Sequence, residues 1–231
     1  MVLAAGLGTR LRPLTDTRPK ALVEIAGRTL LEITLERLRD SGIDAVIINV
    51  HHLADMIVEY LKAKNHFGMH IEISREELLL DTGGGLKKAA WFFRDDAEPF
   101  VLHNVDVITT IDLHLMTEYH KDNRALATLA VQDRPTSRPL VFDNQLRLRG
   151  RGPGLAFAGI HVISPQLLPK LTGDGAFSII NSYLRLASED ETILGFHADQ
   201  YFWRDVGKLD DLRHIEKDLP LEHPLRRPGR E

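Results

Sequence analysis

The chain has 231 residues, of which 43% are hydrophobic and 27% charged, and its formal net charge is −4. This composition is sufficient for one hydrophobic core, and the balanced charge argues against a nucleic-acid partner. The absence of cysteine excludes disulfides, thiolate metal sites and cysteine nucleophiles. No stretch approaches the roughly 18 apolar residues of a membrane span, and the start lacks a signal-peptide pattern. We therefore expect a soluble, cytoplasmic protein with no membrane partner.

The first half of the chain predicts strands that alternate with helices. Short apolar or β-branched runs indicate strands at 2–5, 45–50, 70–74 and 100–102. Leucine spacing and amphipathic patterns indicate helices at 30–38, 54–64 and 86–93, the last preceded by three glycines. This alternation predicts an α/β fold, a Rossmann-like and mostly parallel sheet with helices on both faces.

The second half continues this pattern with one interruption. A helix is expected at 113–121 and a strand at 125–131, after which 134–154, rich in Pro, Gly and Arg, indicates a small β-rich lobe or flap. A strand at 156–163 and helices near 166–171, 179–188 and 208–219 follow. We therefore predict one domain over 1–219 and a loose tail over 220–231.

The most informative segment is the loop after the first strand. It contains Gly6 and Gly8, which allow a ligand to approach the backbone amides closely, and then four cations, Arg10, Arg12, Arg18 and Lys20. Amides together with guanidinium and ammonium groups suit an oligophosphate. A solvated strand-to-helix turn explains the spacing equally well. The dinucleotide fingerprint and the P-loop are both excluded, because the third glycine of one and the Gly-Lys-Ser/Thr ending of the other are missing.

This loop resembles the signature of the nucleotidyltransferases that activate sugar 1-phosphates, Gly-x-Gly-x-Arg-x-x-Pro-Leu-Thr followed by Pro-Lys. All the specified positions match: Gly6, Gly8, Arg10, Pro13, Leu14, Thr15, Pro19 and Lys20. The resemblance covers roughly 1–212 and implies the nucleotide-diphospho-sugar transferase fold, with 1–219 as the catalytic domain. It implies that the loop wraps the nucleotide triphosphate, through Ala4, Ala5, Gly6, Gly8, Thr9 and Arg10. As catalytic residues it indicates Arg10, for the departing pyrophosphate, and Lys20, for the attacked phosphate.

Two aspartates are candidate ligands for Mg²⁺. Nucleotidyl transfer develops negative charge that Mg²⁺ held by carboxylates can stabilise, and open α/β sheets bind ligands at the carboxyl ends of strands. Asp106 follows a predicted strand, and Asp205 lies in Trp-Arg-Asp-Val-Gly. Taken singly, each is more typical of a turn or a helix cap. Their surroundings resemble the family's Asn-Gly-Asp and Trp-x-Asp-Val-Gly motifs, which implies metal binding. Val105 replaces the usual glycine and Lys208 a common threonine.

Two further segments resemble parts of the family's nucleotide and sugar pockets. The stretch from Asp81 to Gly85 is similar to Glu-Thr-Gly-Gly-Gly, which implies a nucleotide contact at Gly83 and sugar contacts at Gly84 and Gly85. Tight packing of a helix on a sheet is the alternative explanation. Asn104 and Gly159, the latter in Phe-Ala-Gly-Ile, are the other implied sugar contacts.

The resemblance implies a magnesium-dependent enzyme that joins a sugar 1-phosphate to a nucleoside triphosphate and releases pyrophosphate. The short chain and the triple glycine favour UTP and an N-acetylated amino sugar 1-phosphate, as in the uridylyltransferases for N-acetylmuramate 1-phosphate. A guanylyltransferase for mannose or heptose 1-phosphate is the alternative. A non-catalytic nucleotide-sensing subunit is a further one, although it would not require both metal carboxylates and Lys20. The sequence does not fix the oligomeric state, and a homodimer is compatible with it.

Overall fold

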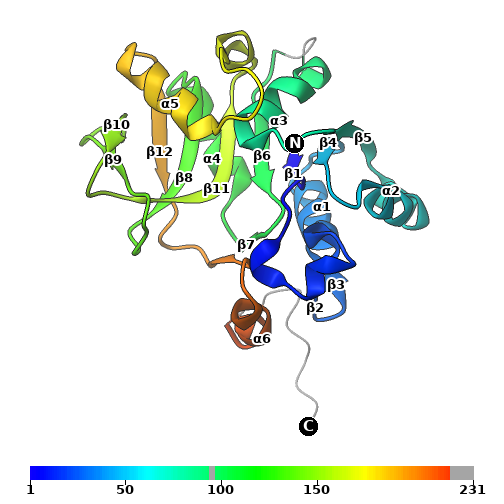
Figure 1. Cartoon of the computed structure of the whole chain (residues 1–231). Helices are drawn as coiled ribbons and strands as arrows, with labels where there is room; N and C mark the ends of the chain where they lie inside the picture. Colours follow the sequence, from blue (N-terminus) through cyan, green and yellow to red (C-terminus); the bar gives the residue numbers. More distant parts are fainter. Residues whose placement is uncertain (94–96, 219–231) are drawn as a thin grey trace.

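A seven-stranded sheet forms the centre of the computed structural model, which describes residues 1–93 and 97–218 (Figure 1). The strand order is β12-β8-β11-β6-β1-β4-β5, and β11 alone runs antiparallel to its two neighbours in this sheet. The bounds are β1 Val2–Leu3, β4 Ala45–Val50, β5 His70–Arg75, β6 Phe100–Asn104, β8 Ala127–Gln132, β11 Ala156–Ile163 and β12 Ile193–His197. The predicted α/β fold with a mostly parallel sheet is confirmed.

Helices cover both faces of this sheet. They are α1 Leu30–Asp40, α2 Ala54–Ala63, α3 Asp81–Ala89, α4 Leu113–Asp122 and α5 Ile179–Ser188, whereas α6 Leu209–Asp218 lies below the sheet in Figure 1, beside Trp203–Asp205. The residues buried beneath α1, α2 and α4 form one hydrophobic cluster, and those beneath α3 and α5 form another. Val2 and Leu3 belong to different clusters because successive strand side chains point to opposite faces. The two-residue strand β1 therefore anchors both layers.

Three small antiparallel ribbons accompany the main sheet. They are β2 Glu24–Ile25 with β3 Arg28–Thr29, β7 Val107–Thr109 with β13 Trp203–Asp205, and β9 Leu140–Phe142 with β10 Leu148–Arg151. The last ribbon lies within the predicted β-rich segment 134–154. Strands β2, β3, β7 and β12 were not predicted. The helix predicted at 166–171 is the 3₁₀ helix Pro165–Lys170, and the tail over 220–231 lies outside the described residues.

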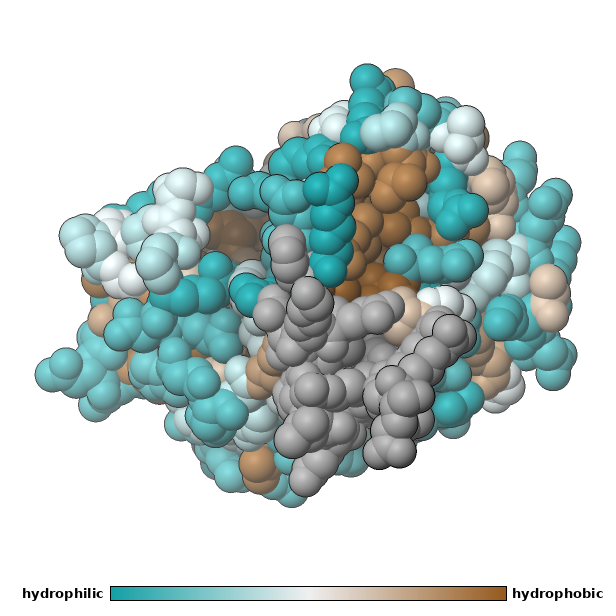
Figure 2. Space-filling model, turned by 90° about the horizontal axis from the view of Figure 1, so that it is seen from below, coloured by the Kyte–Doolittle hydropathy of each residue, from teal (hydrophilic) through white to brown (hydrophobic). Residues whose placement is uncertain are grey.

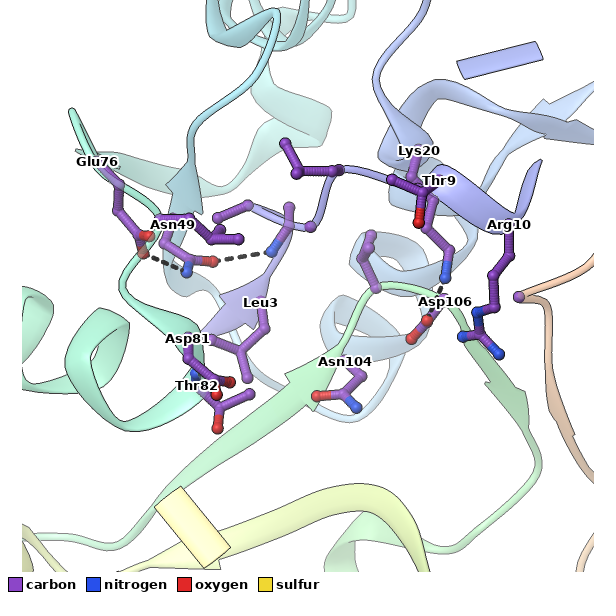
Figure 3. A pocket seen from close by; sticks show the side chains of 18 of the residues that line it. Leu3, Thr9, Arg10, Lys20, Asn49, Glu76, Asp81, Thr82, Asn104 and Asp106 are labelled. Atoms are coloured by element: carbon purple, nitrogen blue, oxygen red, sulfur yellow. Dashed lines mark hydrogen bonds and ion pairs between the residues drawn. The ribbon is translucent and has the colours of Figure 1, made fainter. Parts of the chain in front are cut away.

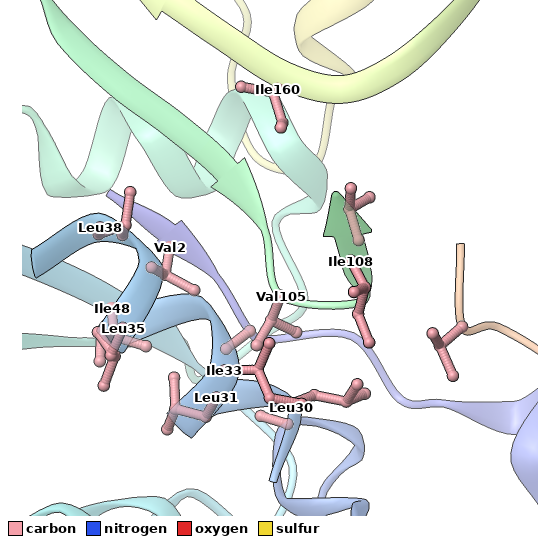
Figure 4. Packing of buried hydrophobic residues seen from close by; sticks show 14 of the residues in the cluster. Val2, Leu30, Leu31, Ile33, Leu35, Leu38, Ile48, Val105, Ile108 and Ile160 are labelled. Atoms are coloured by element: carbon pink, nitrogen blue, oxygen red, sulfur yellow. The ribbon is translucent and has the colours of Figure 1, made fainter. Parts of the chain in front are cut away.

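Helix α1 packs on the sheet through the apolar residues whose spacing predicted it. Leu30, Leu31, Leu35 and Leu38 are almost completely buried, and the Thr29 hydroxyl caps the helix by accepting from the Glu32 amide at 3.0 Å. Figure 4 shows this stripe facing Val2 and Ile48, with Val105 beside it. Val105 is 4% exposed, so the side chain that replaces the family's glycine contributes to this core.

The surface is mainly polar. Seen from below, hydrophilic side chains cover most of the visible face, and a hydrophobic area is exposed between them (Figure 2). Within residues 1–93 and 97–218, no helix combines the length and apolar character that crossing a membrane requires.

Of the three histidines that are buried among the described residues, His103 and His161 have the most strongly lowered pKa values. Burial lowers the pKa of both His103 and His161 from 6.5 to about 3, with a further contribution from Arg37 for His103. His161 is paired with the Tyr183 hydroxyl at 3.0 Å between Oη and Nδ1. Below about pH 6.5 these histidines bind protons in the unfolded chain but not in the folded chain. The free energy of unfolding therefore decreases as the pH falls from 6.5 toward 3.

We predict that the free energy of unfolding falls between pH 7 and pH 5 by roughly 2 kcal/mol for each of these histidines. Urea titrations at several pH values measure this slope. His161→Gln should flatten the slope, whereas His114→Gln, at an exposed position, should leave it unchanged. An equal slope in all three proteins would contradict the assignment.

Candidate active site

The glycine loop at the carboxyl end of β1 forms one wall of a cavity of about 550 Å³. Gly8 adopts φ +64°, and its carbonyl accepts from the Thr15 hydroxyl at 2.8 Å and from the Leu11 amide at 2.8 Å. A Cβ at position 8 would lie 2.8 Å from the Thr15 methyl, so both the conformation and the space require glycine. Seven predicted residues of this segment line the cavity: Ala4, Ala5, Gly6, Gly8, Thr9, Arg10 and Lys20.

Four charged side chains meet where the loop faces the ends of β6 and β13. Lys20 forms an ion pair with Asp106, as Figure 3 shows. Burial and then Asp106 raise the pKa of Asp205, against the opposing effects of Lys20 and Arg10. Arg10 also reaches Gly207, where an added Cβ would lie 2.7 Å from its guanidinium and 3.0 Å from the Asp205 carboxylate. Two cations from the loop and two distant aspartates thus share one charge cluster.

Backbone pairing holds the two aspartates together. Asp205 in β13 is aligned with Val107 in β7, directly after Asp106, and the Val206 amide donates to the Asp106 carbonyl at 2.8 Å. Neighbouring carboxylates repel each other, and without such restraint they would move apart. The chain segment that carries Asp205 is therefore fixed against the segment that carries Asp106.

This carboxylate pair has the donor chemistry that Mg²⁺ prefers. The Oδ1 atom of Asp205 is buried and has no hydrogen-bond partner among the described residues. A buried carboxylate oxygen without a partner is costly, and coordination of a cation would satisfy it. No group of three or more metal-ligating side chains occurs in the described part of the chain, so phosphate oxygens or water would complete the coordination.

A second cavity of about 320 Å³ adjoins the first, and both are lined by Asn104 and Asp106. Asp205 and the predicted Gly159 line this second cavity. Gly159 has φ +79°, and a Cβ there would lie 3.0 Å from the Asn104 amide nitrogen. Two connected chambers, which meet at the carboxylates, provide space for two substrates.

Comparison with known proteins agrees with this geometry. The family model described as nucleotidyl transferase matches residues 1–142. N-acetylmuramate alpha-1-phosphate uridylyltransferase of Caulobacter vibrioides is 32% identical over 228 residues, which cover 90% of either chain. The chain belongs to the nucleotidyl transferase family. It is accordingly an enzyme of the sugar 1-phosphate nucleotidyltransferase type, and this finding argues against the non-catalytic alternative.

Further relatives of this nucleotidyltransferase do not all share one named substrate. The Neisseria meningitidis N-acetylmuramate alpha-1-phosphate uridylyltransferase is 30% identical, with 94% of this chain and 96% of the relative covered. The mannose-1-phosphate guanyltransferase of Candida albicans is also 30% identical, but the chain spans 61% of its length. The solved structure of HddC from Yersinia pseudotuberculosis complexed with GMP-PN has a TM-score of 0.76 at 23% identity, covers 92% and 95% of the two chains, and supports the fold.

The nucleotidyltransferase site contains polar residues that the sequence analysis did not identify. The Asn49 amide accepts from the Ala4 backbone N–H at 2.8 Å and donates to Glu76 at 2.7 Å, and both residues line the first cavity (Figure 3). The second carboxylate oxygen of Glu76 accepts from the Leu80 amide at 2.9 Å. A polar residue inside the apolar run from Ala45 to Val50 was the available signal for Asn49. This clamp fixes the start of the loop.

The three glycines differ in place and environment from the sequence prediction. They lie within α3, which begins at Asp81, and not before a helix. The Gly83 and Gly84 amides both donate to the Phe177 carbonyl, at 2.8 and 3.3 Å. A Cβ at Gly85 would lie 2.7 Å from Glu76. Among the described residues, Asp81 and Thr82 line the first cavity and the glycines line neither, so their predicted substrate contacts stay a prediction and their packing role is the observed one.

We predict that Gly84→Ala lowers the free energy of unfolding by about 1–3 kcal/mol, despite the better helix propensity of alanine. Its Cβ would lie 2.3 Å from the Gly175 backbone carbonyl oxygen, so backbone must move. Urea denaturation measures the change. Gly150→Ala is the matched control, because its Cβ meets nothing within 4 Å. A stability equal to that of the control would contradict this prediction, because the backbone at Gly175 would then move without an energetic cost.

Proposed function

We propose that this enzyme transfers the uridylyl group of UTP to an N-acetylated amino sugar 1-phosphate and releases pyrophosphate. The observation that carries the proposal is the convergence of the glycine loop, Lys20 and two aspartates on adjoining cavities. The choice of substrates is supported by two relatives of nearly the same length that are named N-acetylmuramate alpha-1-phosphate uridylyltransferase. We assign the catalytic domain to residues 1–219.

The proposed reaction is an in-line displacement at phosphorus. An oxygen of the sugar 1-phosphate forms a bond to the α-phosphorus of the nucleotide, and the bond to the bridging oxygen of the departing pyrophosphate breaks. The nucleophile is already an anion, so no general base is required. The protein contributes by positioning the two phosphates and by balancing the charge that develops.

The residues of the charge cluster have distinct proposed roles. Arg10 contacts the phosphates that leave, and Lys20 exchanges its contact with Asp106 for the oxygens of the attacked phosphate. Asp106 and Asp205 would hold Mg²⁺, which supplies neutralisation of negative charge on the phosphates when bound. Since Lys20 is 8% exposed and already fixed by the fold, little side-chain entropy would be lost on this exchange.

The remaining assignments concern binding. The amides of Ala4, Ala5, Gly6, Gly8 and Thr9 would surround the triphosphate, with the nucleoside toward Asn49 and Glu76 in the first cavity. The sugar would occupy the second cavity beside Asn104 and Gly159. Gly83, Gly84 and Gly85 would then act on both substrates through the packing of α3.

We predict that Asp106→Asn lowers turnover at least about a hundredfold, because one preorganised electrostatic contact is lost at the reacting phosphate. Pyrophosphate release at saturating substrates measures the effect across a Mg²⁺ titration. Asp122→Asn, which changes an exposed carboxylate at the end of α4, should behave like the wild type. Turnover close to the wild-type value in Asp106→Asn would remove Asp106 from the metal site.

The base is tested by measuring pyrophosphate release with UTP, GTP, CTP, ATP and dTTP, each against a panel of sugar 1-phosphates. We expect kcat/KM to be highest with UTP. A preference for GTP with mannose or heptose 1-phosphate would instead support the guanylyltransferase alternative, to which the mannose-1-phosphate guanyltransferase relatives point.

A further inference from the structure

The second cavity is lined by more positive charge than one phosphate requires. Arg134, Arg138 and Arg151 line it, and its only acidic lining residues in the described part of the chain are Asp106 and Asp205. These two carboxylates belong to the charge cluster at the junction with the first cavity. The three guanidinium groups therefore need a separate explanation.

Arg134 lies against Trp203 and close to Asp205. Its guanidinium lies 3.7 Å from the centroid of the Trp203 ring and donates to the Phe157 carbonyl at 2.9 Å. Trp203 in turn donates its indole N–H to the Ala158 carbonyl at 2.7 Å. Arg134 is thus held rigidly beside β13, where it is suited to the reacting phosphate of the acceptor.

Arg151 is the last residue of β10, and Arg138 lies two residues before β9, both away from β13 in the sequence. Arg151 is aligned with Leu140, and Arg138 precedes Leu140 by two residues, so both side chains start at one end of the ribbon. Arg151 makes one long contact, 3.4 Å to the Asn181 amide oxygen. The Arg138 backbone amide donates to the Thr136 hydroxyl at 3.3 Å, but no described residue forms a hydrogen bond or ion pair with the Arg138 guanidinium. Two like charges that line one cavity repel each other unless an anion lies between them.

The neighbouring arginine on the same strand shows the opposite situation. Arg149 forms an ion pair with Asp143, with 2.7 Å between Nη2 and the carboxylate, and it does not line the cavity. The ribbon therefore supplies an acidic partner for the arginine outside the cavity and none for the two that line it. Such an arrangement is typical of recognition of a ligand anion by guanidinium groups.

We propose that the acceptor sugar carries a second acidic group, a carboxylate or a second phosphate, in addition to its 1-phosphate, and that Arg138 and Arg151 bind this group. This inference rests on the proposed function, because it assigns the second cavity to the sugar 1-phosphate. It narrows the acceptor from amino sugars in general to those that bear an acidic substituent.

The experiment compares pairs of acceptors in which one member carries an additional acidic substituent, through pyrophosphate release with UTP and with GTP. N-acetylmuramate 1-phosphate against N-acetylglucosamine 1-phosphate, and glucuronate 1-phosphate against glucose 1-phosphate, test a carboxylate. Glucose 1,6-bisphosphate against glucose 1-phosphate tests a phosphate. We expect the acidic member of at least one pair to have a kcat/KM about tenfold or more higher, the effect of a charge-assisted hydrogen bond.

The variant Arg138→Gln/Arg151→Gln should reduce that acidic-to-neutral ratio about tenfold, whereas Arg149→Gln should leave the ratio unchanged. Melting temperatures of the variants check that each is folded, and Arg→Lys at both positions should restore part of the ratio. Equal or better use of the neutral sugars by the wild type would overturn this inference while leaving the transferase intact, as would an equal loss with both members of a pair. No pyrophosphate from any pair would contradict the transferase reaction itself, and the inference with it.

Discussion

The site depends on keeping two carboxylates close together against their mutual repulsion. Asp106 and Asp205 are far apart in the sequence, and burial and proximity together raise the pKa of Asp205. The fold opposes this repulsion in two ways. The β7–β13 ribbon and the Val206–Asp106 backbone hydrogen bond fix the geometry, and Lys20 and Arg10 supply compensating charge. The fold therefore holds the two carboxylates and the two cations of the cluster in place without a ligand.

The glycine loop is also fixed by a small number of contacts. It leaves the sheet from β1, a strand of two residues whose side chains enter the hydrophobic clusters on opposite faces. Asn49 holds the first loop amide, and Thr15 holds the turn at Gly8. Each of these contacts joins the loop to a rigid neighbour. Backbone amides fixed in this way require little reorganisation when they bind an anion.

The second cavity joins this rigid centre to a more peripheral element. The β9–β10 ribbon lies outside the main sheet, beside β12 in Figure 1, and it contributes Leu140 and Arg151 to the lining. Elements of this kind can change their side chains without disturbing the core, which is why specificity commonly resides in them. In this chain, the glycine loop and the β7–β13 ribbon would then supply the reaction chemistry, and the β9–β10 ribbon the choice of acceptor.

The sequence by itself determined the alternation of strands and helices, the apolar stripe of α1 and the loop motif, because these are encoded by spacing within a few residues. It also identified Asp106 and Asp205, through short motifs. Only the tertiary structure decided that Asn49 clamps Ala4, that α3 starts at Asp81 with its glycines packed inside it, and that Arg134, Arg138 and Arg151 line one cavity. Those features depend on hydrogen bonds and packing between segments distant in the chain, and local periodicity contains no information about such contacts.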